Sequence, residues 1–165
     1  MKYLHWVAAA FATLVLALPA SARKTVIPVE TDHVQLILAV QDNGVLQTLH
    51  FGAKIADPSA FEAFGTGRGT DNGEGPMAYP TTGGRYIGEP ALHVKYSDGY
   101  HNTQLFYTGH TVRVNGNIVN TVVTLQDKVT LMEVKLLFDA YQKEDVICTH
   151  TEILNGGKQP VELLN

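Results

Sequence analysis

Histidine, cysteine and acidic side chains bind metals or move protons in most enzymes, and in this sequence they are scattered. Apart from His5, histidines stand at positions 33, 50, 93, 101, 110 and 150, about one to each expected strand or turn. No H-x-x-x-H or H-E-x-x-H pair is present, so a metal site would need separate strands to bring the rings together. We therefore expect structural or surface roles for these histidines and predict no metal site.

Other motifs that would carry chemistry are absent or incomplete. The glycine-rich stretch 65–69 lacks the spacing of a nucleotide-binding loop, and residues 71–74 (DNGE) lack the residue order of a calcium loop. No G-x-S-x-G elbow is present, and Glu89 and Glu133 cannot be singled out as a carboxylate pair for glycoside cleavage. The single cysteine, Cys148, stands in an apolar alternation, which predicts a small buried side chain and no internal disulfide.

Apolar residues recur with period two along most of the chain, as in half-buried β-strands. Residues 34–40 and 45–51 flank an Asp-Asn-Gly turn and are expected to pair as a hairpin. Residues 104–114 are expected to run back along residues 91–96. Further strands are expected at 118–125, 130–141 and 146–154 and from residue 161 onward. The pattern predicts an all-β fold, an antiparallel β-sandwich with half of each strand's side chains facing inward.

The segment 56–90 does not fit this rhythm, because it is rich in glycine and proline. A loop of this length inside a compact domain usually has a function or lies beneath another element. Within it, residues 57–64 are expected to form one or two turns of helix.

The first 22 residues have the pattern of a cleavable signal peptide. Lys2 gives a positive start, residues 6–18 are apolar but too few to span a bilayer, and residues 20–22 (ASA) fit a cleavage site. The alternative is an uncleaved anchor. We expect the mature protein to begin at Arg23, to form one domain over residues 23–165, and to be periplasmic or secreted from a bacterium. Loss of Lys2 changes the formal net charge from −4 to −5, which disfavours nucleic acid or an anionic membrane as partner.

Several short blocks of sequence resemble, in the same order, the N-terminal domain of glycoside hydrolase family 36. They are Y-P-T-T-G at 79–83, G-E-P-A-L-H-V at 88–94, D-G at 98–99, L-F-Y-T-G-H at 105–110, L-M-E-V at 131–134, D-V-I at 145–147, N-G-G at 155–157 and P-V at 160–161. Each block is short, and the specificity lies in their order over almost the whole mature chain.

The resemblance implies part of a β-supersandwich, incomplete at its C-terminal end, from an exported bacterial α-galactosidase that retains configuration. In this family a (β/α)₈ barrel follows and carries both catalytic aspartates, so the resemblance assigns no catalytic residue to this chain. We expect the chain alone to be inactive and to need no cofactor. The implied partners are the catalytic barrel, galactose-containing oligosaccharides bound by the parent enzyme, and a second subunit in a homo-oligomer.

The resemblance also implies that the long loop can reach the active site of a neighbouring subunit. The matching stretch is 83–88, where Arg85 and Tyr86 are the candidate substrate-binding residues, Tyr86 by stacking on a sugar face. Many family members have Asp-Phe-Arg where this chain has Tyr86-Ile87-Gly88. That departure removes the acidic and guanidinium groups that could contact sugar hydroxyls.

Two other interpretations stay open. A stand-alone secreted sandwich could bind carbohydrate without catalysis, which would need an exposed aromatic platform, with Tyr79, Tyr86, Tyr100 and Tyr107 as candidates. A structural remnant would fold poorly because its supersandwich is incomplete. Soluble expression favours the first of these, and insoluble product favours the second.

Overall fold

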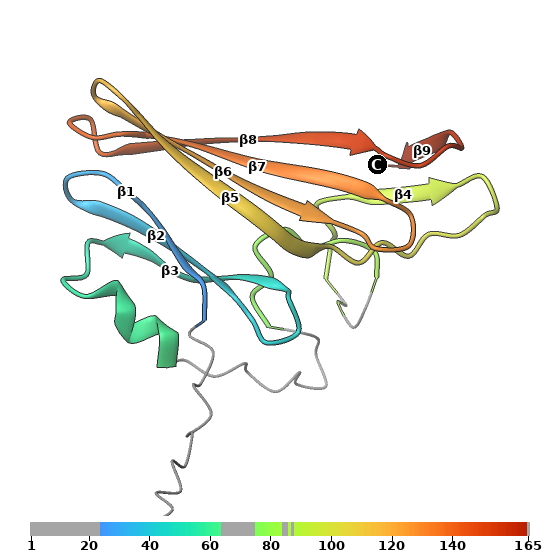
Figure 1. The fold of residues 1–165 in the computed structure, drawn as a ribbon, viewed down its shortest axis with the longest axis horizontal. Coiled ribbons are helices and arrows are strands. Elements are labelled where there is room, and N and C mark those ends of the chain that lie inside the picture. The colour runs from blue at the N-terminus through green and yellow to red at the C-terminus, as the bar shows by residue number, and fades with distance from the viewer. Residues whose placement is uncertain (1–23, 64–74, 84–85, 87, 165) are drawn as a thin grey trace, which may run out of the picture.

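The computed structural model describes residues 24–63, 75–83, 86 and 88–164 (Figure 1). In chain order its elements are β1 (Val26–Glu30), β2 (Val34–Val40), β3 (Leu46–Ala53), the 3₁₀ helix η1 (Pro58–Ala63), β4 (His93–Tyr96), β5 (Phe106–Asn115), β6 (Ile118–Gln126), β7 (Met132–Tyr141), β8 (Val146–Asn155) and β9 (Val161–Leu164). The expected signal peptide, residues 1–22, lies outside the described residues. No helix in the described part is long and apolar enough to cross a membrane.

The strands form two packed layers and a short ribbon (Figure 1). One layer is the sheet β1-β2-β3, and the other is the sheet β5-β6-β7-β8, in which each strand pairs with the next along the chain. The ribbon β4-β9 lies beyond one end of the four-stranded sheet. All of these strand pairs are antiparallel, which confirms the predicted sandwich.

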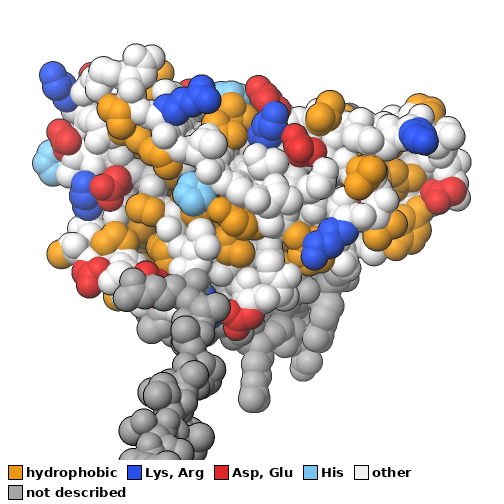
Figure 2. Space-filling model, viewed as in Figure 1, with side chains coloured by type: hydrophobic (Ala, Val, Ile, Leu, Met, Phe, Trp, Pro, Cys, Tyr) orange, Lys and Arg blue, Asp and Glu red, His pale blue; other side chains and the backbone are white. Residues whose placement is uncertain are grey.

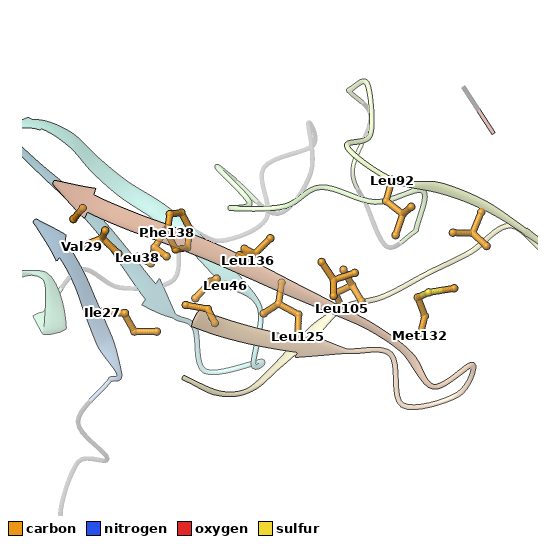
Figure 3. Close-up of a cluster of buried hydrophobic side chains, with 14 residues drawn as sticks. Ile27, Val29, Leu38, Leu46, Leu92, Leu105, Leu125, Met132, Leu136 and Phe138 are labelled. Carbon is orange, nitrogen blue, oxygen red and sulfur yellow. The ribbon is translucent and has the colours of Figure 1, made fainter. Parts of the chain in front are cut away.

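The hydrophobic core lies between the two layers and continues under β4 (Figure 3). β7 shows how the sequence builds it, because its even-numbered residues from Met132 to Ala140 are buried and its odd-numbered residues are half-buried. This period of two turns one face of β7 toward the three-stranded sheet. Burying each large aliphatic side chain on that face contributes about 1.5–3 kcal/mol.

The hairpin predicted around residues 42–44 is confirmed as β2 and β3. Gly44 adopts a φ of 86°, a left-handed conformation that favours glycine, and its N–H donates to the carbonyl oxygen of Gln41 at 2.8 Å. The side-chain oxygen of Asn43 accepts from the N–H of Val45 at 3.0 Å. The turn therefore follows directly from the local sequence.

The outer strands of the long sheet correct one expectation. Half of the side chains of β6 and β7 face inward as predicted, but almost all side chains of β5 and β8 are exposed or half-exposed. The three-stranded layer is narrower and covers the two middle strands. Cys148 lies on β8 and is exposed, so the prediction that it is buried was wrong.

The pairing of β4 also differs from the expectation. β4 pairs with β9, with Lys95 and Glu162 forming an ion pair at 3.4 Å, and the segment expected to run back along it joins the long sheet instead. The chain leaves β4 through a tight turn and then turns away from it. The N–H of Thr103 donates to the carbonyl oxygen of Thr82, and the N–H of Gln104 donates to the carboxylate of Asp127. β1 was not predicted at all. The expected helix is present as η1.

Candidate functional site

The two candidate substrate-binding residues have different outcomes. Arg85 lies outside the described residues. The hydroxyl of Tyr86 donates to the carbonyl oxygen of Glu89 at 3.3 Å, and its ring lies so close to Gly88 that a Cβ there would be 2.5 Å from the hydroxyl oxygen. Tyr86 is therefore folded back on its own loop.

The Y-P-T-T-G block forms the base of this loop. Thr81 is buried, and its hydroxyl donates to the carbonyl oxygen of Thr103 at 2.6 Å, while Thr82 accepts from the N–H of Thr103 at 2.7 Å. A Cβ on Gly83 would collide with the side-chain oxygen of Asn102 and the carbonyl oxygen of Thr103. Glycine is thus required for the two chain segments to pass this closely.

The D-V-I block joins the two sheets through hydrogen bonds of its first residue, Asp145. Asp145 lies at the turn between β7 and β8 and has a φ of 53°. It contacts the turn between β1 and β2 of the other sheet. Its carboxylate accepts from the hydroxyl of Thr31 at 2.8 Å and the N–H of His33 at 2.9 Å, and lies 2.8 Å from the His33 ring. These hydrogen bonds hold the pKa of Asp145 below its ordinary value, and the one with the His33 ring contributes most. We call this set of contacts the Asp145 clasp.

The N-G-G block and the L-F-Y-T-G-H block make local contacts in the outer strands of the long sheet. Asn155 accepts from the N–H of Gly157 at 3.0 Å and donates to the carbonyl oxygen of Gln159 at 2.8 Å, which shapes the turn before β9. The Tyr107 hydroxyl lies 2.7 Å from Nδ1 of His110 on β5, and burial raises the pKa of Tyr107. These residues explain the fold rather than a reaction.

The four tyrosines considered for a sugar platform do not come together. Tyr79 donates to the carbonyl oxygen of Ala91, and burial raises its pKa. Tyr86 and Tyr107 make the contacts given above. Tyr100 is half-exposed and tilted against Tyr96, with ring centroids 6.5 Å apart. Of the four, Tyr79 lines a groove between the sheets, and Tyr100 lines a broader surface groove near the turn at 97–100.

That groove, the tyrosine groove, has a volume of about 440 Å³ and lies between the turn at 97–100, residues 129–131 and the loop 155–161. It offers aromatic and polar groups together, which is the composition that sugar rings require. Its main side chains are Tyr96, Asp98, Tyr100, Leu131, Asn155 and Lys158.

A second hollow, the interlayer groove, runs where β8 extends past the three-stranded sheet. It has a volume of about 250 Å³, and its side chains include Leu36, Thr48, Tyr79, Phe138, Thr149 and Thr151. Hydrophobic side chains reach the surface between the layers and again near β4 and β9 (Figure 2). From Thr149 to Ile153 the inner face of β8 is therefore left exposed by the described residues, whereas Ile147 on the same face packs on the core.

One pair of histidines is brought together although the sequence spacing gave no such signal. Nε2 of His93 lies 3.2 Å from Nδ1 of His101, across the turn that follows β4. No group of three or more histidine, cysteine or acidic side chains suited to a metal is found among the described residues.

Comparison with known families identifies most of the chain. Residues 44–165 match the family described as the glycosyl hydrolase family 36 N-terminal domain. No curated protein matches the sequence.

Solved structures with the same fold include α-galactosidases. The enzyme from Lactobacillus brevis has 17% identity and a TM-score of 0.72, with 88% of this chain and 23% of that chain covered. AgaA from Geobacillus stearothermophilus has 20% identity and a TM-score of 0.71, with 84% of this chain and 23% of AgaA covered. The galactosidase domain of the α-galactosidase–sucrose kinase AgaSK has 21% identity and a TM-score of 0.72, with 84% and 23% covered. Variants of AgaA were crystallised with raffinose and with stachyose.

The chain spans about a quarter of the length of these enzymes. At this identity the structures establish the fold, and the family match extends over about three quarters of the sequence. The two-layer antiparallel body agrees with both. The chain belongs to the glycosyl hydrolase family 36 N-terminal domain family.

Proposed function

We propose that this chain is the non-catalytic N-terminal domain of an exported, α-galactosidase-like glycoside hydrolase that acts on α-galactosides. Its role is to support the catalytic barrel and a subunit interface. The substrate class is supported by similar enzymes, since variants of AgaA were crystallised with raffinose and stachyose. The chain's own role is supported by its family match over residues 44–165.

The observation that carries the supporting role is the exposed inner face of β8 from Thr149 to Ile153. Ile153 on this face is 40% exposed, and Thr149 and Thr151 open into the interlayer groove. In a β-sandwich this face normally packs against a second layer. We infer that a further part of the parent enzyme packs here and buries the groove.

A substitution in the groove tests this role. In a chain that also carries the catalytic barrel, Thr151→Arg places a charge in the packed interface and lowers the yield of active enzyme on a chromogenic α-galactoside several-fold. Cys148→Arg is the matched control, because residue 148 is exposed on the opposite face of the same strand. Equal activity of the two variants would show that nothing packs on the inner face.

Export is supported by the pattern of residues 1–22. Expression in a bacterial host should give a periplasmic or secreted product whose N-terminal sequence starts at Arg23. A product that keeps residue 1 and stays with the membrane fraction would instead establish the uncleaved anchor.

Carbohydrate binding without catalysis is the second candidate function, and the tyrosine groove favours it. Tyr100 is 50% exposed above polar side chains of the groove. Calorimetric titration of the chain with raffinose should show weak binding. Tyr100→Ala should abolish this binding, and Tyr86→Ala, the control, should leave it intact. Absence of binding to the unaltered chain would leave the supporting role as the function.

A further inference from the structure

The pair formed by His93 and His101 has the geometry of a two-ligand metal site. The two facing ring nitrogens are 3.2 Å apart, and the ring centroids are 5.3 Å apart with the rings tilted by 55°. Two nitrogens bound to one zinc ion at about 2.05 Å in tetrahedral geometry are separated by about 3.3 Å. At the right angle that Cu²⁺ prefers, the separation is about 2.9 Å. The observed distance lies between these values.

We propose that His93 and His101 bind one divalent late transition-metal ion, with Cu²⁺ bound most tightly and Ni²⁺ and Zn²⁺ more weakly. Imidazole is a good ligand for all three ions, and the order follows their general affinity for nitrogen ligands. Two protein nitrogens leave the remaining coordination positions to water, because the described residues supply no third histidine, cysteine or carboxylate to the cluster.

The backbone fixes the relative positions of His93 and His101 before any ion binds. His93 begins β4, next to buried Val94, and His101 follows a tight turn closed by the N–H of Tyr96 and the carbonyl oxygen of Tyr100 at 2.8 Å. The carbonyl oxygen of His101 accepts from the hydroxyl of Thr82 at 3.0 Å. The backbone of the site is therefore organised from both sides, and little backbone entropy is lost on binding.

The rings are also open to solvent. His93 is partly exposed and His101 is exposed, so an ion can reach the facing nitrogens without opening the core. In the absence of metal the same nitrogens can share one hydrogen bond if one ring donates and the other accepts. Metal binding replaces this hydrogen bond and selects the tautomers in which both facing nitrogens carry lone pairs.

A bound ion would join β4 to the base of the long loop. The segment that follows His101 carries Thr103, which holds both Thr81 and Thr82 through its backbone. The ion thus fastens the edge strand to this loop base, and it stabilises the folded state in proportion to its occupancy.

Copper titration of the full chain, prepared without a polyhistidine tag, tests the proposal. Isothermal titration calorimetry should give one dominant Cu²⁺ site. Electron paramagnetic resonance should show hyperfine coupling of the copper to two imidazole nitrogens. His93→Ala and His101→Ala should each weaken that site about tenfold or more, because a chelating pair becomes a single ligand. His150→Ala is the control and should leave the affinity unchanged, since residue 150 lies on β8.

Thermal unfolding provides a second measurement that does not depend on counting ions. Cu²⁺ or Zn²⁺ should raise the melting temperature of the unaltered chain and of His150→Ala, and a chelator should reverse the rise. Neither ion should raise it in His93→Ala or His101→Ala. Equal copper affinity in the unaltered chain and the His93→Ala variant, with both folded by circular dichroism, would overturn the proposal.

Discussion

At the scale of single residues, the side chains that match the family fasten the fold. Gly83 allows the loop base to pass Asn102 and Thr103, Asn155 shapes the turn before β9, and Asp145 fastens one layer to the other. Their positions at turns and at contacts between segments explain why the domain carries a recognisable pattern. One substitution and one pH dependence test the roles of Gly83 and Asp145.

Gly83→Ala is expected to destabilise the domain by about 1–3 kcal/mol, because the added methyl group meets backbone and must displace it. Urea unfolding followed by circular dichroism measures the change. Gly109→Ala is the matched control, since a Cβ there has nothing within 4 Å. If both variants unfold at the same urea concentration, the close approach at Gly83 does not constrain the fold.

The Asp145 clasp predicts a stability loss at acid pH. Since hydrogen bonds from His33 and Thr31 hold the pKa of Asp145 below 3.8, the clasp contributes stability above that value and loses it as pH falls through the folded-state pKa. The melting temperature of the unaltered chain should therefore fall more steeply below about pH 4 than that of Asp145→Asn. Asp32→Asn, a substitution beside the clasp, is the control and should behave like the unaltered chain. If the melting temperature of Asp145→Asn falls as steeply at acid pH, other carboxyl groups cause the acid sensitivity.

At the scale of elements, what is local in sequence could be predicted and what is non-local could not. The β2–β3 hairpin, β6 and β7 follow from alternation and turn residues that lie within the segment itself. β1 was missed because its five residues, with Pro28 in the middle, lack a clear alternation. The pairing of β4 with β9 joins segments about 65 residues apart in sequence, and no local pattern encodes it.

The same reasoning applies to the candidate sites. His93 and His101 come together because the chain reverses between them, and this reversal could have been suspected from the Asp-Gly turn at 98–99. The tyrosine groove draws on three segments distant in sequence. Tyr86 was singled out by its alignment with family members, and the structure shows its hydroxyl occupied by its own loop.

Opposite faces of β7 give a test of the two-layer packing. Leu136 is buried between the layers and Leu137 is half-buried on the other face of the same sheet. Leu136→Ala is expected to cost about 2–5 kcal/mol of unfolding free energy, and Leu137→Ala clearly less. Chemical unfolding measures both, and a larger loss in Leu137→Ala would mean that the opposite face forms the core.

At the scale of the whole molecule, the two layers do not cover each other completely. The long sheet has two inner strands packed on the smaller sheet and two outer strands, β5 and β8, with little covering in the described part. This shape agrees with the proposed role of supporting a larger body. The comparison enzymes, of which the chain spans about a quarter, supply the proposed context.

The most direct test of the proposed role is turnover of a chromogenic α-galactoside by this chain alone and by this chain joined to the catalytic barrel. A retaining glycosidase needs two carboxyl groups in defined positions, and the proposal places both in the barrel. The chain alone should therefore release no product above background, whereas the joined protein should be active. Release of product by the isolated chain, at a rate that survives purification to homogeneity, would contradict the assignment of this domain as non-catalytic.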